Sequence, residues 1–141
     1  MRELAPPKGH PPPHDVRLRA GDVIALAPWA VQASDRHLAA HPEELERYGP
    51  HARDWCAHDL QWLSLWAIMD ADGQAVDFNA QLDWLARILK ARGYPLGSLA
   101  DALDTLAEEL AGSLPDAALR LQAGAARVRR PGPLQRAMNK H

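Results

Sequence analysis

Apolar residues recur at helical spacing through most of the chain, and they are densest between residues 54 and 70. On a helical wheel the three tryptophans of this stretch, Trp55, Trp62 and Trp66, fall close together, and other apolar residues face the opposite side. A helix that is apolar on more than one side is usually central in its fold. We therefore predict a central helix here, with the tryptophan face packed in the core.

Proline and glycine divide the rest of the chain into further helices. Proline fits the first turn of a helix and disrupts later turns, and glycine often follows the last turn. No segment alternates polar and apolar residues as a half-buried strand would. The pattern predicts an all-α fold of five main helices and one short helix, which begin near Pro28, Pro42 (the short helix), Pro50, Phe78, Ser98 and Pro115.

Side-chain caps are predicted at three of these helix starts. Asp77 precedes one helix and is a favourable N-cap residue. Ser98 with Asp101, and Ser113 with Asp116, have the spacing of a capping box, with Asp in place of Glu or Gln. The helix after Ser98 has the clearest amphipathic pattern, and its apolar stripe consists of Leu99, Leu103, Leu106 and Leu110.

Length and composition indicate one folded unit between two tails. A chain of 141 residues is long enough to bury about two-thirds of its unfolded surface. The five prolines within residues 1–20 predict a flexible tail, residues 131–141 are predicted to form a basic tail, and residues 21–130 form the helical domain. Because no apolar run is long enough to span a membrane and no signal segment is visible, we expect a cytoplasmic protein.

The familiar catalytic motifs are missing from the sequence. Cys56 is the single cysteine, so there is neither a disulfide framework nor a paired-cysteine motif, and we interpret it as a small core residue. Phosphate-binding loops, dinucleotide fingerprints, metalloprotease motifs and nucleophile elbows are also missing. We therefore predict no catalytic residues and no enzymatic activity.

One histidine pair has the spacing of metal ligands. His37 and His41 are four residues apart, which places two side chains on one helix face. Pro42 argues against a site, because the residue before a proline is pushed out of the helical conformation. Since no third ligand is apparent nearby, we interpret the two histidines as a surface pair at a helix end and predict no metal site.

Asp59 and His58 are the candidates for a ligand pocket. On the wheel Asp59 lies within the tryptophan face, where a carboxylate is costly unless it is paired or hydrogen-bonded. It is either a sensing residue at a pocket mouth or, the interpretation we favour, bonded structurally to a neighbouring helix end or to Arg53 or Arg87. His58 is placed to ligate haem or a bilin, but one histidine names no cofactor, and none is predicted. The candidate pocket residues are Asp59, His58, Trp55, Trp62 and Trp66.

The charges are unevenly spread, although the formal net charge is only −2. Acidic residues gather within residues 43–46 and 101–109, whereas arginine and lysine dominate residues 120–140. Such an asymmetry can guide a protein partner. Nucleic acid is not the expected partner, because the basic segment has no helix-turn-helix pattern and no interleaved aromatic residues.

Two apolar stripes suggest self-association. One is the leucine stripe of the helix after Ser98, and the other lies on the helix after Asp77 and is flanked by Trp84 and Ile88. Together they offer more apolar surface than a single layer of helices must hide, and exposed apolar patches usually mark interfaces. We predict a homodimer, the commonest closed assembly of identical chains. The competing interpretation is that both stripes are buried within the monomer. The candidate interface residues are Trp84, Ile88, Leu99, Leu103, Leu106 and Leu110.

The segments HPEELERYGPHARDWCAHDLQWL and FNAQLDWLARILKARGYPL, followed by the leucine-striped helix, carry a resemblance. This order is similar to the globin-like helical sensory domains at the N-termini of RsbR-type stressosome proteins and of some cobalamin-binding or STAS regulators. The similarity covers about residues 29–121, and it implies a globin-like sensory or interaction module that need not keep haem. Leu63 stands where such domains often have a histidine, which weakens any carry-over of a ligand. The specific points are His41-Pro42, Tyr48-Gly49, Cys56 with Asp59, and the segment from Trp84 to Gly93.

These observations predict a non-enzymatic regulatory or sensory module that acts through contact with a protein partner. The alternative is a globin-like protein that binds a tetrapyrrole, haem or bilin, or another small ligand. A further alternative is an enzyme whose site no motif reveals.

Overall fold

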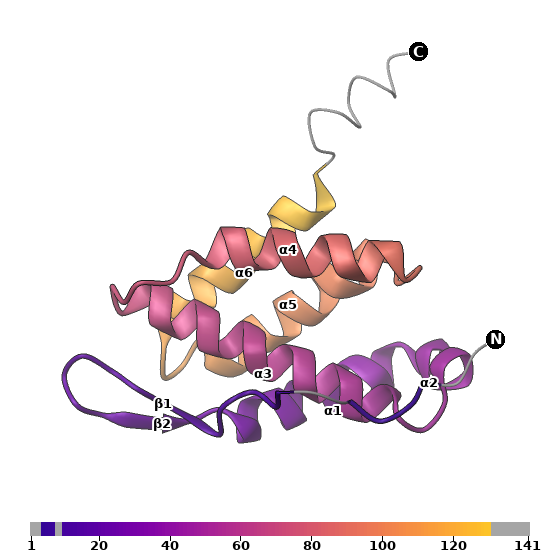
Figure 1. The fold of residues 1–141 in the computed structure, drawn as a ribbon, viewed down its shortest axis with the longest axis horizontal. Coiled ribbons are helices and arrows are strands. Elements are labelled where there is room, and N and C mark those ends of the chain that lie inside the picture. The colour runs from indigo at the N-terminus through magenta and orange to yellow at the C-terminus, as the bar shows by residue number, and fades with distance from the viewer. Residues whose placement is uncertain (1–3, 8–9, 131–141) are drawn as a thin grey trace, which may run out of the picture.

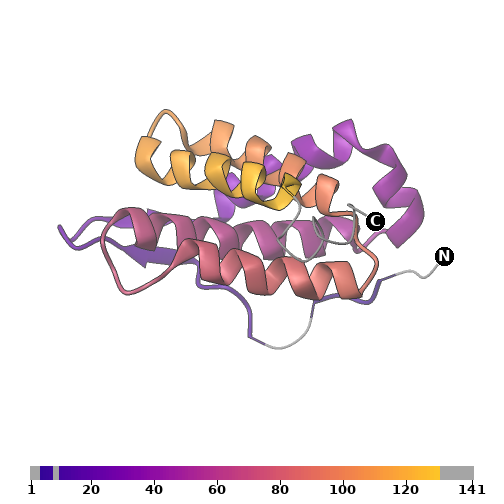
Figure 2. The ribbon, with the colours of Figure 1, turned by 90° about the horizontal axis from the view of Figure 1, so that it is seen from above.

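The computed structural model of the protein describes residues 4–7 and 10–130, and six helices make up most of them. Figure 2 shows α5 and α6 in one layer and α3 with α4 in the other. The predicted all-α, single-domain bundle with one short helix is confirmed. The helices are α1 (Ala27–Ala40), α2 (Pro42–Tyr48), α3 (Ala52–Ala71), α4 (Phe78–Ala91), α5 (Leu96–Leu110) and α6 (Pro115–Arg129).

Helix α3 is central, as predicted, but its tryptophan face is not the core. It contacts the five other helices of the described chain (Figure 1). Its three tryptophans are only partly buried, and Trp62 and Trp66 pack against the core from its edge, so the tryptophan face borders the core and does not fill it. Small residues on another face of α3 allow the neighbouring helices to approach, and that face carries the fully buried side chains of Leu60, Leu63, Ser64, Ala67 and Ile68.

A short antiparallel hairpin precedes α1 and corrects the prediction that the chain forms no strand. Strand β1 (Asp15–Arg17) pairs with β2 (Val23–Ala25), and Val16 lies opposite Ile24. Gly21, in the connection, has a φ of +103°, which favours glycine. Each strand is three residues long, too short for its alternation to stand out. The folded part of the chain therefore begins before residue 21.

The predicted N-terminal tail contacts the helices where it is described. The indole N–H of Trp55 donates a hydrogen bond to the Ala5 carbonyl at 2.6 Å, and the Gln61 amide donates one to the Pro13 carbonyl at 2.8 Å. The predicted boundary near residue 20 therefore does not separate the body from a tail. The predicted basic tail, residues 131–141, lies outside the described residues.

Two of the three predicted side-chain caps are not formed. Asp77 does cap α4, because its carboxylate accepts a hydrogen bond from the Ala80 N–H at 3.2 Å. Helix α5 begins two residues before Ser98, which therefore lies inside the first turn. The residue that precedes α6 is Leu114, so Ser113 lies one position too early to cap that helix.

The leucine stripe of α5 is buried within the monomer. Its four leucines are at most 3% exposed, and α5 contacts both α1 and α6. This burial corrects the assignment of Leu99, Leu103, Leu106 and Leu110 to a dimer interface. Of the remaining candidates, Trp84 is 50% exposed and Ile88 is partly exposed.

Asp70 ties together three helices. Its carboxylate accepts a hydrogen bond from the Phe78 N–H at the start of α4, at 2.7 Å, and another from Arg120 Nε of α6, at 3.0 Å. The Phe78 amide, with Arg120 beside it, lowers the pKa of Asp70 below its ordinary value. The ionised carboxylate therefore stabilises the folded state.

We expect the effect of Asp70→Asn on stability to depend on pH. Because the pKa of Asp70 is lower in the folded chain, its contribution is present above the unfolded-state pKa of about 3.9 and is lost as the pH falls through the folded-state pKa. Thermal unfolding should show a lower Tm for the variant at neutral pH and a smaller difference at about pH 2. The exposed Glu46, as Glu46→Gln, is the control. An equal loss from Asp70→Asn at both pH values would contradict this explanation.

Helix α6 approaches α4 closely at Gly124, where a Cβ atom would lie 2.8 Å from Cε2 of Phe78 and 2.9 Å from Cδ2 of Leu82. We expect Gly124→Ala to destabilise the fold, because overpacking costs about 1–3 kcal/mol and outweighs the about 1 kcal/mol by which alanine favours a helix. Gly97→Ala in α5 is the control, since a Cβ there meets nothing within 4 Å. Chemical denaturation measures both variants, and similar values for the two would show that α4 and α6 have room to separate.

Candidate functional site

An open groove of about 720 Å³ lies between α3 and α4, and its lining includes every pocket residue predicted from the sequence. A volume of this size falls within the range of small-molecule sites, about 300–1,000 Å³. We call it the tryptophan groove. It is lined by Trp55, His58, Asp59, Trp62 and Trp66 of α3, by Ala80, Gln81, Trp84, Leu85 and Ile88 of α4, and by His10 and Arg92.

Aromatic faces form much of this groove. The rings of Trp62 and Trp66 are stacked one helical turn apart, with centroids 5.7 Å apart and planes inclined by 29°. Trp55 meets the His58 ring edge-on, at a centroid distance of 5.6 Å. Trp84 is half exposed on the α4 side. Such a surface can pack against planar or apolar groups of a ligand or of a partner.

Asp59 is partly buried, and its carboxylate oxygen lies 3.1 Å from Nδ1 of His58. The favoured prediction, a bond to a neighbouring helix end or to an arginine, is wrong. Arg53 instead pairs with Asp35 at 2.6 Å, and within residues 4–7 and 10–130 no bond joins Asp59 to Arg87. The carboxylate is satisfied locally, by the residue before it.

A second, smaller cavity of about 170 Å³ adjoins the groove. Asp59 and Arg92 line both spaces, so they stand at the wall between them. Apolar side chains such as Leu60 and Leu63 make up most of the cavity lining, and Glu44 and Tyr94 also reach it. The groove, the cavity and the groups around Glu44 are therefore contiguous.

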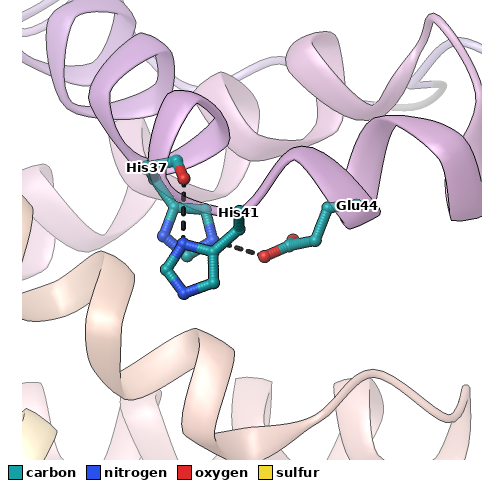
Figure 3. Close-up of side chains that lie close together, drawn as sticks. All are labelled: His37, His41 and Glu44. Atoms are coloured by element: carbon teal, nitrogen blue, oxygen red, sulfur yellow. Dashed lines mark hydrogen bonds and ion pairs between the residues drawn. The ribbon is translucent and has the colours of Figure 1, made fainter.

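Beside the cavity lies a buried polar cluster that sequence analysis missed (Figure 3). Nε2 of His37 is 2.7 Å from one carboxylate oxygen of Glu44, and the Tyr94 hydroxyl donates to the other oxygen at 2.6 Å. The His41 ring stacks on His37 with a centroid distance of 4.2 Å. His37 is 1% exposed, so the interpretation of the histidines as a surface pair is wrong. The turn at Pro42 folds α2 back and brings Glu44 against α1.

The charges of this cluster are set by its hydrogen bonds. Burial by itself raises the pKa of Glu44, but the bonds from His37 and Tyr94 outweigh it and hold that pKa below its ordinary value. Burial, together with the carboxylate of Glu44, raises the pKa of Tyr94. Desolvation opposes a charge on His41, yet the His37 carbonyl and Asp101 outweigh it and raise the His41 pKa. Glu44 is therefore a buried carboxylate that favours positive charge around it.

No protein-family model, curated protein or solved structure matches the chain. Within the described residues, no helix is both long and apolar enough to cross a membrane. The function has to be argued from the geometry of the groove, the cavity and the cluster.

Cys56, which lines the cavity, should react slowly with thiol reagents. Burial raises the pKa of its thiol to about 12, and only the thiolate is a good nucleophile. At pH 8 we expect alkylation by iodoacetamide to be about three orders of magnitude slower than for a free thiol of pKa about 8.5. The protein unfolded in guanidinium chloride is the control and should react at the free-thiol rate. Rapid labelling of the native protein would show that the surroundings of Cys56 do not suppress its thiolate.

Proposed function

We propose that this protein is a non-enzymatic regulatory or sensory module of the cytoplasm that binds a protein partner through the tryptophan groove. The observation that supports this most is that four of the five tryptophans of the chain line one open groove. Tryptophan and arginine are enriched among the residues that dominate binding energy at protein interfaces. The groove has both, since Arg92 lies at its wall.

The shape of the groove favours a helical or extended apolar segment as the bound part of the partner. It lies between two helices, and an amphipathic helix in such a groove is a common mode of recognition. Trp84 is 50% exposed in the monomer, which leaves apolar surface available for contact. The resemblance to globin-like sensory domains points to the same class of function. A second copy of this chain, bound through Trp84 and Ile88, is one form that the partner can take.

The groove offers little support for catalysis. His58 and Asp59 are the paired titratable side chains of its lining, and they bond to each other. The described lining holds no serine, threonine, cysteine, tyrosine or lysine that this pair could activate as a nucleophile. Binding is therefore the function that this arrangement favours.

A second candidate function, the binding of haem, a bilin or another planar ligand, is favoured by one observation. Two histidines, His10 and His58, line a groove that also carries stacked indole rings. Imidazole is a common axial ligand of haem. The ultraviolet-visible spectrum of protein purified from its native host separates the two candidates. A Soret or bilin band favours the ligand, and a spectrum of tryptophan alone favours the protein partner.

We expect Trp84→Ala to weaken partner binding by about 30-fold or more with little change in stability. An exposed substitution usually changes the unfolding free energy by less than about 0.5 kcal/mol, whereas truncation of a central interface tryptophan costs about 2 kcal/mol or more, about 30-fold in Kd. Affinity purification from the native host identifies proteins retained by the wild type and lost by the variant, and titration with the purified partner then measures Kd.

Leu119→Ala is the matched control for this experiment, since Leu119 is 59% exposed on α6, outside the groove. It should leave Kd unchanged. Sedimentation of the wild type and of Trp84→Ala over a concentration series measures self-association, and so tests whether the partner is a second copy of this chain. If Trp84→Ala retains every specific partner and the same self-association as the wild type, the groove is not the interface.

A further inference from the structure

We infer that His37, His41 and Glu44 form a binding site for a divalent transition metal ion, with Zn²⁺ as the best match. One ring nitrogen of each histidine and a carboxylate oxygen of Glu44 all lie within 4.8 Å of one another. Figure 3 shows the three side chains converging where α1 ends and α2 begins. Two imidazoles with one carboxylate are a known ligand set for zinc, with a fourth position left open. This inference concerns a different site from the groove and does not depend on the proposed function.

The backbone explains why these three side chains meet. His37 lies in the last turn of α1, and His41 follows the helix with φ −130° and ψ 63°. Pro42 then begins α2, which places Glu44 in the first turn of a helix that points in a new direction. The break at the proline brings the Glu44 carboxylate to 2.7 Å from Nε2 of His37, whereas a continuous helix would place the two residues about 10 Å apart along its axis.

The observed distances are close to those that a metal ion needs. Zinc bonds of about 2.0–2.2 Å in tetrahedral geometry place ligand atoms about 3.2–3.6 Å apart. Nε2 of His37 and the Glu44 oxygen, now 2.7 Å apart, would have to separate slightly. The His41 ring, now stacked on His37, would have to tilt, because parallel rings direct their lone pairs along parallel lines. The His41 side chain is 21% exposed and has the space for that rotation at the protein surface.

The neighbouring groups suit the outer shell of a metal site. Tyr94 donates to the Glu44 oxygen that does not face His37, which leaves the other oxygen for an ion. The His37 carbonyl lies 2.9 Å from Nδ1 of His41, and Asp101 lies 3.1 Å from Nε2. A ligating imidazole keeps one such bond for orientation and gives its other nitrogen to the ion, so binding would break one of these two bonds.

The hydrogen bonding of the His37 ring also bears on how an ion would bind. Its Nδ1 atom is buried and has no hydrogen-bond partner within the described part of the chain. No acceptor therefore holds a proton on Nδ1, and the tautomer is set from the Nε2 side alone. With an ion at Nε2 the ring proton would lie on Nδ1, where the described residues supply no acceptor, so this nitrogen lowers the affinity expected of the site.

Metal titration of the whole protein tests this site. After treatment with EDTA, the protein is titrated with Zn²⁺ in competition with a chromogenic chelator, and with Co²⁺ while visible absorption is recorded. We expect one ion per chain and intense Co²⁺ bands typical of four-coordinate geometry. His41→Gln and Glu44→Gln should each weaken Zn²⁺ binding about 100-fold or more, because even outer-shell changes cost about 10- to 100-fold.

His51→Gln is the matched control, since His51 also pairs with a carboxylate, that of Asp54 at 2.9 Å, but lies outside the cluster. It should bind Zn²⁺ as the wild type does. Tyr94→Phe should weaken binding and keep one ion per chain. Circular dichroism checks that each variant folds, and His41→Gln, the change at the most exposed ligand, carries the test if Glu44→Gln does not fold. Absence of stoichiometric binding at micromolar Zn²⁺, or equal affinity in wild type and His41→Gln, would overturn the inference.

Discussion

The close packing of one face of α3 constrains the rest of the structure. Because α3 touches every other described helix, the face that it buries decides what its other faces can do. That face includes Ser64 and Ala67, both 0% exposed, and small residues let neighbouring helices come near. The Ser64 hydroxyl donates to the Leu60 carbonyl at 2.7 Å, so its burial leaves no orphaned hydroxyl. The bulky tryptophans are left for the side toward α4, where the groove opens.

The fold class and most helix starts could be predicted because they depend on local sequence. Helical periodicity, prolines in first turns and the Asp77 cap act over a few residues. The tryptophan face could not be assigned correctly in the same way. A helical wheel ranks a face by its apolar content, whereas burial depends on which partner faces fit against it. The hairpin had a signal, since Val16 and Leu18 alternate with arginines before Gly21, but it follows a proline-rich stretch that suggests no fold.

The tryptophan groove and the polar cluster around Glu44 differ in how far apart in the sequence their residues lie. The groove residues of α3 follow one another at helical spacing, so they could be grouped from the sequence alone. The residues of α4 that form the other wall could not be added without the structure. The polar cluster joins Glu44 to His37 across a helix break and to Tyr94, 50 positions away. Contacts of that kind depend on the tertiary fold. Pro42, which argued against a metal site in the sequence, is the residue that brings Glu44 to His37 in the structure.

Helix α4 and the residues that follow it up to Tyr94 connect the groove with the polar cluster. Helix α4 forms one wall of the groove, and three residues after its last turn Tyr94 donates its hydrogen bond to Glu44. An occupant of the groove that displaces α4 would therefore also change the distance between Tyr94 and Glu44. Linkage makes such an effect reciprocal: if the groove changes the affinity of the cluster for an ion, the ion changes the affinity of the groove by the same factor. Any such coupling would pass through the hydrogen bond between Tyr94 and Glu44, because it joins the end of the groove wall to the cluster.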